Sequence, residues 1–235
     1  MSELILVRHG QASFGAASYD KLSPAGIEQV RLLSQHWESL GEQFDCVYAG
    51  TLQRQLETAR ELLPRVPAAE GPIINPAFNE YDGDPLIAAY LRDHASSEGF
   101  TPGLALPIRD NRLFQQVFEG ATAHWIRGTL RPTEAEAGFE HWADFQRRVH
   151  GAIDDIMARH QGGSRVLIST SGGVIALALQ RVLGFPDETA IATNWMVHNS
   201  SVTRIRYGKG RASLTLFNNL AHLERPDRKH MITYR

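Results

Sequence analysis

The pattern of hydrophobic and polar positions predicts strands that alternate with helices along most of the chain. Leu4–Val7 contains four consecutive apolar residues, which is typical of a strand buried on both faces. Further strands are predicted at 45–49, 73–74, 165–169, 201–207 and 212–217. Apolar positions at helical spacing predict helices at 24–40, 51–63, 139–160 and 172–183. This alternation predicts an α/β fold, a three-layer sandwich with a mostly parallel central sheet flanked by helices.

One internal segment, residues 84–131, departs from this alternation. Its apolar residues are scattered at helical spacing among glycines and prolines, with no strong strand signal. We therefore expect a single domain over residues 1–235, with a mainly helical cap inserted at 84–131. The segment from Arg225 onward is polar and basic, and it is predicted to be a loose surface tail.

Composition and charge narrow the classes of protein that fit. Of the 235 residues, 43% are hydrophobic and 21% are charged, which is ordinary for a globular protein. A net charge of −2 gives no reason to expect nucleic acid or an anionic membrane surface as a partner. The single cysteine, Cys46, excludes an internal disulfide and fits a reducing compartment. The charged start of the chain is unlike a signal peptide, and no apolar run approaches the thickness of a bilayer. We expect a cytoplasmic protein, and no pattern indicates its oligomeric state.

The first strand ends in a group of residues with chemical potential, Arg8-His9-Gly10-Gln11. In open parallel sheets the carboxyl ends of the strands are where ligands bind. Arginine holds phosphate oxygens with two parallel hydrogen bonds, and its charge favours a neutral, nucleophilic histidine. Gly10 is expected to allow a sharp turn of the backbone. The group therefore suits attack by an imidazole on a phosphoryl group.

An apolar strand that ends in Arg-His-Gly resembles the start of the histidine phosphatase superfamily, also called the phosphoglycerate mutase-like family. Three further segments are similar to that family: 22–26 followed by Gln29, 48–54 followed by Thr58-Ala59, and 79–83. Together these segments span most of the chain outside the expected cap. The resemblance implies the phosphoglycerate mutase-like fold.

The resemblance also implies a role for each matching residue. His9 would accept the phosphoryl group, Arg8 and Arg54 would hold it, and Glu80 would protonate the leaving oxygen and later activate water. Position in the motif favours Glu80 over Asp82 as the acid. Residues expected to contact the substrate are Arg8, Gly10, Gln11, Arg54, Ser171 and Gly172.

One position departs from the family pattern in a way that affects the chemistry. After the strand at 165–169 the family usually carries a second histidine before Gly-Gly, and this chain has Ser171 instead. A serine hydroxyl is shorter and uncharged, and losing one preorganised donor typically costs about a hundredfold or more in rate. Three interpretations remain open: the site works without the histidine, another histidine (His124, His198 or His222) enters it, or the site binds phosphorylated ligands with weak turnover. Ser171→His is expected to raise turnover if the pocket is otherwise preserved, and no gain would indicate that another group has taken over the role of the histidine.

These observations predict a metal-independent phosphomonoester hydrolase that acts on a small phosphorylated metabolite through a phosphohistidine. No cofactor is implied, and the ten dispersed histidines show no metal-ligand spacing. One alternative is a weakly active protein that binds a phosphorylated ligand or phosphate ion. A second is a mutase-type phosphotransferase, against which stands Gly15, where mutases of the family tend to carry asparagine. A third is a serine hydrolase that uses Ser171 with Asp187 and either His198 or His222.

Overall fold

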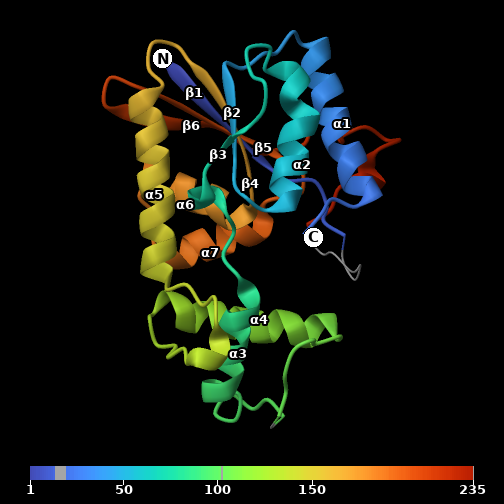
Figure 1. The fold of residues 1–235 in the computed structure, drawn as a ribbon. Helices are drawn as coiled ribbons and strands as arrows, with labels where there is room; N and C mark the ends of the chain where they lie inside the picture. The colour runs from blue at the N-terminus through green and yellow to red at the C-terminus, as the bar shows by residue number, and fades with distance from the viewer. Residues whose placement is uncertain (14–19, 102, 235) are drawn as a thin grey trace. The chain divides into compact units, whose positions relative to one another are not determined.

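A computed structural model of the chain describes residues 1–13, 20–101 and 103–234 (Figure 1). The chain divides into two compact units, the first made of Met1–Glu80 and Val149–Arg235 and the second of Tyr81–Arg148. The centre of the first unit is a six-stranded sheet with the strand order β3-β2-β4-β1-β5-β6. Its strands are β1 (Ser2–Arg8), β2 (Cys46–Ala49), β3 (Ile73–Ile74), β4 (Arg165–Thr170), β5 (Val202–Gly208) and β6 (Arg211–Asn219).

Strand pairing in this sheet is mixed, with the parallel part in the middle and at one edge. β1 pairs in parallel with β4, β4 with β2, and β2 with β3. The last two strands form antiparallel pairs, β5 with β1 and β6 with β5. Three of the five pairings are therefore parallel, and the predicted α/β fold class is confirmed.

Helices cover the sheet of the first unit. They are α1 (Pro24–Ser39), α2 (Gln53–Leu62), α6 (Gly172–Leu183) and α7 (Asp187–Met196), with α5 (Trp142–Arg159) beginning in the second unit and ending in the first. Short 3-10 turns lie at η1 (Leu63–Arg65), η2 (Pro76–Phe78) and η4 (Lys229–Met231). The prediction missed α7, because only Ala190 and Ile191 of this helix are buried and they form no repeating apolar stripe.

Burial of β1 on both faces explains its apolar sequence. Leu4, Ile5, Leu6 and Val7 are all fully buried. Ile5 and Val7 belong to a cluster that also holds buried residues of α1 and α2. Leu4 and Leu6 point to the opposite face, because side chains alternate along a strand, and α6 packs against β1 (Figure 1). The strand is thereby fixed between two layers, and its carboxyl end has a defined position.

The expectation of a loose tail from Arg225 is wrong. Met231 and Ile232 pack against a cluster of Leu32, Leu220 and Leu223. The Gln29 amide of α1 donates to the Met231 carbonyl at 2.7 Å and to the Thr233 hydroxyl at 2.9 Å. Met231 and Ile232 therefore anchor the segment, although its overall composition is polar and basic.

The second unit is helical and contains α3 (Gly83–His94), α4 (Asn111–Ile126) and the 3-10 turn η3 (Glu134–Glu136). An aromatic cluster stabilises it: Trp125 lies 4.6 Å from Tyr81 and 4.9 Å from Trp142, measured between ring centroids. The expected cap at 84–131 falls within this unit, and its role as a cap stays a prediction. In the part of the chain that the structure describes, no helix has the length and apolar character needed to cross a membrane.

Candidate active site

The carboxyl ends of β1 and β4 bring two of the predicted residues to the same edge of the sheet. Arg8 is the register partner of Thr170, so His9 and Ser171 leave neighbouring parallel strands at the same level. The backbone N–H of His9 donates to the Thr170 carbonyl at 2.8 Å, which continues the ladder by one residue. His9 is 6% exposed and Ser171 is 1% exposed. Both side chains therefore lie at a buried point of the sheet edge.

The His9 ring is held in one tautomer. Its Nδ1 lies 2.7 Å from the Gly10 carbonyl oxygen, which can only accept, so Nδ1 carries the proton. Nε2 is then the unprotonated nitrogen, and the Nε–H of Arg54 donates to it at 3.2 Å. Burial, the charge of Arg54 and the charge of Arg8 lower the pKa of His9 well below its usual value, and the Gly10 bond opposes this only in part. The imidazole is therefore neutral at neutral pH and has a nucleophilic nitrogen.

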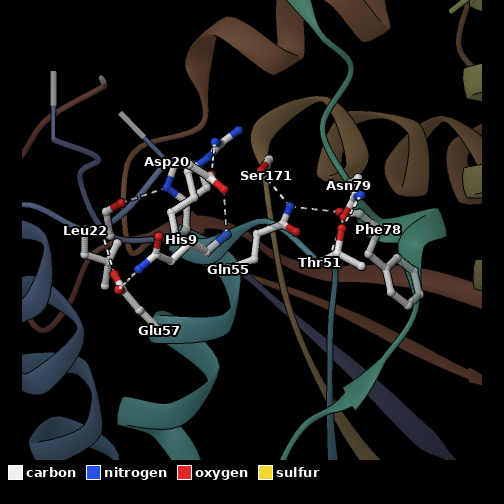
Figure 2. Close-up of polar contacts among 12 residues, drawn as sticks. His9, Asp20, Leu22, Thr51, Gln55, Glu57, Phe78, Asn79 and Ser171 are labelled. Atoms are coloured by element: carbon white, nitrogen blue, oxygen red, sulfur yellow. Dashed lines mark hydrogen bonds and ion pairs between the residues drawn. The ribbon is translucent and has the colours of Figure 1, made fainter. Parts of the chain in front are cut away.

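Arg54 reaches His9 from the first turn of α2. Its Nη1 forms an ion pair with Asp20 Oδ1 at 2.5 Å, and the other carboxylate oxygen of Asp20 accepts from the Gln53 N–H at 2.8 Å (Figure 2). Asp20 thus fixes both the guanidinium and the start of the helix. Asp20 was not predicted as a site residue, because an acidic residue after a run of mostly small residues carries no distinctive signal.

Arg8 belongs to the same strand end as His9. Its Nη1 donates to the carbonyl oxygen of Val197, the residue after α7. The charge of Arg8 also lowers the pKa of His9, so a second guanidinium acts electrostatically on the imidazole.

Gly10 and Gln11 connect the strand end to the helices behind it. The Gly10 N–H donates to the Thr58 hydroxyl at 3.1 Å, and the Gln11 N–H donates to the Gln29 side chain at 2.8 Å. A Cβ on Gly10 would lie 2.3 Å from the carbonyl oxygen of Gly26. Gly10 has no positive φ. The glycine is therefore required by this close approach and not by the sharp turn that was expected.

Glu80 lies at the N-terminus of α6. Its Oε2 accepts from the backbone N–H of Gly173 at 2.9 Å, which fixes the carboxyl group beside the first turn of the helix. Asp82, the other candidate acid, instead accepts from the Asp84 N–H at the start of α3. Gly172 has a packing role, because a Cβ there would lie 2.5 Å from the Asn194 side-chain oxygen.

Gln55 is the residue beside Ser171, and the sequence analysis did not single it out. It follows Arg54 on α2 and is fully buried. Its Nε2 donates to the Ser171 hydroxyl oxygen at 2.9 Å and to the Phe78 carbonyl at 2.9 Å (Figure 2). In the sequence, a glutamine that is buried in a helix cannot be told from one on the helix surface, so no local pattern indicates Gln55.

The histidines proposed as replacements for the second imidazole have other contacts. His222 Nε2 lies 2.8 Å from the Ser200 hydroxyl, and His198 Nδ1 lies 2.9 Å from the Asn218 amide. His124 belongs to the second unit, where its Nε2 lies 2.9 Å from a Glu98 oxygen.

The alternative serine hydrolase triad is not assembled by the contacts of the described residues. Ser171 contacts the amide of Gln55, which is no base. Asp187 accepts from Gln180 at 2.7 Å, and His198 and His222 have the partners given above.

Gly15 lies outside the described residues, so the comparison with mutases at that position has no structural counterpart. Within residues 1–13, 20–101 and 103–234, no group of three His, Cys, Asp or Glu side chains is arranged to hold a metal ion.

A buried histidine that contacts Arg54 and follows Arg8 at a strand end is found in a known class of proteins. The profile of the histidine phosphatase superfamily (branch 1) matches residues 4–86 and 112–220. Because the match covers most of the chain, the protein belongs to this superfamily, and the resemblance inferred from Arg8-His9-Gly10 is confirmed. Membership supports a phosphoryl-transfer function of the phosphatase or mutase type.

Solved structures with the same fold come from several organisms. They include a phosphoserine phosphatase mutant from Entamoeba histolytica in complex with phosphoserine (18% identity, 95% of this chain and 100% of that chain, TM-score 0.62). A phosphoglycerate mutase from Bacillus anthracis is similar at 21% identity over 94% of each chain, with a TM-score of 0.62. A mycobacterial glucosyl-3-phosphoglycerate phosphatase complexed with VO3 is similar at 20% identity over 93% of this chain and 99% of that chain, with a TM-score of 0.64. These similarities establish a phosphoglycerate mutase-like fold. The comparison with curated proteins found no match.

Proposed function

We propose that the protein is a metal-independent phosphomonoester hydrolase in which His9 forms a phosphohistidine intermediate. The observation that carries this proposal is the geometry of the His9 ring, whose Nδ1 is bound to the Gly10 carbonyl and whose Nε2 faces Arg54 Nε at 3.2 Å. A neutral imidazole that contacts Arg54 and lies in the field of Arg8 combines a nucleophile with the positive charge that a phosphoryl group requires.

In the first step the Nε–H of Arg54 moves from His9 Nε2 to a phosphoryl oxygen, and the freed lone pair of Nε2 attacks phosphorus. The N–P bond forms as the ester P–O bond breaks, and the carboxyl group of Glu80 donates its proton to the departing oxygen. Positive charge that develops on the ring is stabilised by the hydrogen bond from Nδ1 to the Gly10 carbonyl. Arg8 and Arg54 offset the negative charge of the phosphoryl oxygens.

In the second step water replaces the histidine. The Glu80 carboxylate takes a proton from water as the water oxygen attacks phosphorus, and the N–P bond breaks. The products are inorganic phosphate, neutral His9 and protonated Glu80, so the enzyme returns to its starting state. No metal ion takes part in either step as we propose them.

The direct test measures hydrolysis of 4-nitrophenyl phosphate in the presence of EDTA. We expect His9→Ala to lower kcat/KM by at least about a thousandfold, whereas His230→Gln, a change at an exposed histidine, leaves it unchanged. Rapid quenching with a radiolabelled phosphomonoester is expected to trap an acid-labile label on the wild type and none on His9→Ala. If wild type and His9→Ala have equal rates on aryl phosphate, phosphoserine and 3-phosphoglycerate, the proposal is wrong.

A second candidate is a protein that binds phosphorylated ligands with little turnover, and the uncharged side chain of Ser171 favours it. It predicts that inorganic phosphate and vanadate bind to the wild type, measured by calorimetry, while no phosphomonoester is hydrolysed. A mutase is distinguished by transfer of labelled phosphate between positions of 3-phosphoglycerate without release to water.

A further inference from the structure

The amide of Gln55 has one defined orientation. Its nitrogen lies 2.9 Å from the Phe78 carbonyl oxygen, and a carbonyl oxygen can only accept a hydrogen bond. The second hydrogen of the same nitrogen is directed at the Ser171 hydroxyl oxygen, also at 2.9 Å. Since Phe78 determines which end of the amide faces the sheet edge, Gln55 is a donor to Ser171 and not an acceptor from it.

The Ser171 hydroxyl therefore keeps its own hydrogen for another acceptor. It accepts from Gln55, and among the described residues that amide is the only partner of the hydroxyl. Ser171 occupies the N-cap position of α6, where a serine usually accepts from a backbone N–H of the first turn, yet its side chain makes no such bond. The N–H of Gly173 is bound by Glu80 instead. The hydroxyl is thus held out of a capping role and keeps a hydrogen to donate.

Its position relates it to the nucleophile. His9 follows Arg8 and Ser171 follows Thr170, and these two preceding residues are partners in the parallel pair β1–β4. Neighbouring strands of a sheet lie about 4.8 Å apart. Arg54 and Gln55 are consecutive on α2, and one contacts the His9 ring while the other contacts Ser171 (Figure 2). Two neighbouring residues of one helix therefore support two neighbouring strand ends.

Packing around Gln55 shows that the chain makes room for this amide. A Cβ on Gly50 would lie 2.0 Å from Gln55 Oε1, so only glycine leaves space for the side chain as it stands. Within the described part of the chain Gln55 Oε1 is buried and has no hydrogen-bond partner. An unpaired buried carbonyl oxygen destabilises a fold, so stability alone does not explain a glutamine here.

We propose that Gln55 is a positioning residue that orients the Ser171 hydroxyl as a hydrogen-bond donor to the phosphoryl group during transfer to and from His9. This inference rests on the proposed function. In this proposal Ser171 and Gln55 together supply a hydrogen-bond donor at the position where the family usually carries histidine. Gln55 acts only through Ser171 and does not itself contact the substrate.

The test is a double-mutant cycle of Gln55→Met and Ser171→Ala on hydrolysis of 4-nitrophenyl phosphate. Methionine approximates the length of glutamine and lacks the donor. We expect each single change to lower kcat about 10- to 100-fold with less than a threefold change in KM, because the hydrogen bond strengthens in the transition state. The double variant is expected to be no slower than Ser171→Ala, since Gln55 has nothing left to orient.

Ser169→Ala is the matched control. The Ser169 hydroxyl donates to the Gln55 backbone carbonyl at 2.7 Å. Ser169→Ala therefore removes a buried serine hydroxyl from the same strand and leaves the side-chain amide of Gln55 in place. We expect its kcat to stay within threefold of wild type, and urea unfolding verifies that every variant is folded. Multiplicative losses in the double variant, or an unchanged kcat in Gln55→Met, would overturn the inference while leaving the phosphatase intact. A wild type as slow as His9→Ala overturns both proposals.

Discussion

Protonation of His222, a buried residue that contacts Ser200 near the candidate active site, is expected to destabilise the fold. The side chain is 1% exposed, and its Nε2 lies 2.8 Å from the Ser200 hydroxyl. Ser200 has a positive φ of 57°, and its N–H contacts the carbonyl oxygens of Arg8 and His9 at 3.1 and 3.2 Å. His222 therefore supports the turn that holds the end of β1.

The structure gives the size and the sign of the effect. Burial, with smaller effects from His36 and Arg228, lowers the pKa of His222 from 6.5 to about 3. Below pH 6.5 the unfolded chain takes up a proton at this residue and the folded chain does not, so stability is lost as pH falls from 6.5 toward 3. At 1.36 kcal/mol per pKa unit, the upper bound is roughly 5 kcal/mol, and roughly half of it is lost by pH 4.5.

The assay is urea unfolding followed by tryptophan fluorescence at pH 7.5, 6.5, 5.5 and 4.5 for the wild type and His222→Gln. Other groups titrate equally in both proteins, so the difference between the two free energies of unfolding isolates His222. We expect this difference to shift by roughly 2 to 3 kcal/mol in favour of the variant between pH 7.5 and 4.5. His230→Gln, at an exposed site, serves as the control. Parallel pH profiles for the wild type and His222→Gln would refute the reasoning, because they would mean that His222 accepts a proton without unfolding.

Three further predictions follow from the site and its packing. Glu80→Gln removes the proton donor, and kcat for an alkyl phosphate is expected to fall by about 10²- to 10⁴-fold, with a smaller loss on 4-nitrophenyl phosphate, whose leaving group needs no proton. Arg54→Ala removes a charge that lowers the pKa of His9, so the His9 titration followed by NMR is expected to move to higher pH; an unchanged midpoint would contradict the assigned contact. Gly10→Ala places a Cβ 2.3 Å from the Gly26 carbonyl and is expected to cost about 1–3 kcal/mol or more in urea unfolding. Gly71→Ala, whose Cβ meets nothing within 4 Å, is its control, and equal stabilities would refute the packing argument.

The parts of this structure that could be predicted are those determined by short-range patterns. The apolar run Leu4–Val7 predicted a strand between two layers, and the strand is fully buried there. The family resemblance implied that His9 and Ser171 share one site, and the register of β1 and β4 brings both residues to the same edge of the sheet. The first turn of α2 then brought Arg54 to His9, as the resemblance implied.

The parts that could not be predicted depend on contacts between distant residues. Gln55 and Ser171 are separated by 116 positions, and neither residue indicates the other in the sequence. Asp20 and Arg54 are separated by 34 positions, and nothing in the sequence around Asp20 indicates that it pairs with this arginine. Where a side chain completes a site from another element, hydrophobic periodicity carries no information about it.

The Ser171→His substitution shows how one such contact changes an expectation. From the sequence, a histidine at this position was expected to raise turnover. Gln55 Nε2 lies 2.9 Å from the Ser171 hydroxyl, and Ser171 is 1% exposed, so we expect the larger imidazole to crowd the amide. We now expect Ser171→His alone to cost about 1–3 kcal/mol in stability through overpacking and to give no gain in kcat.

Shortening Gln55 as well is expected to reverse that outcome. The double variant Gln55→Ala/Ser171→His opens the space that the amide fills, and a histidine there supplies a donor that carries charge when protonated. Its kcat on 4-nitrophenyl phosphate is expected to exceed that of Gln55→Ala/Ser171→Ala about tenfold or more, since a hydrogen bond to a charged group is worth roughly 1.5–3 kcal/mol. A fully stable Ser171→His variant with raised turnover would show that the amide does not limit this position, because the imidazole would then fit with Gln55 in place.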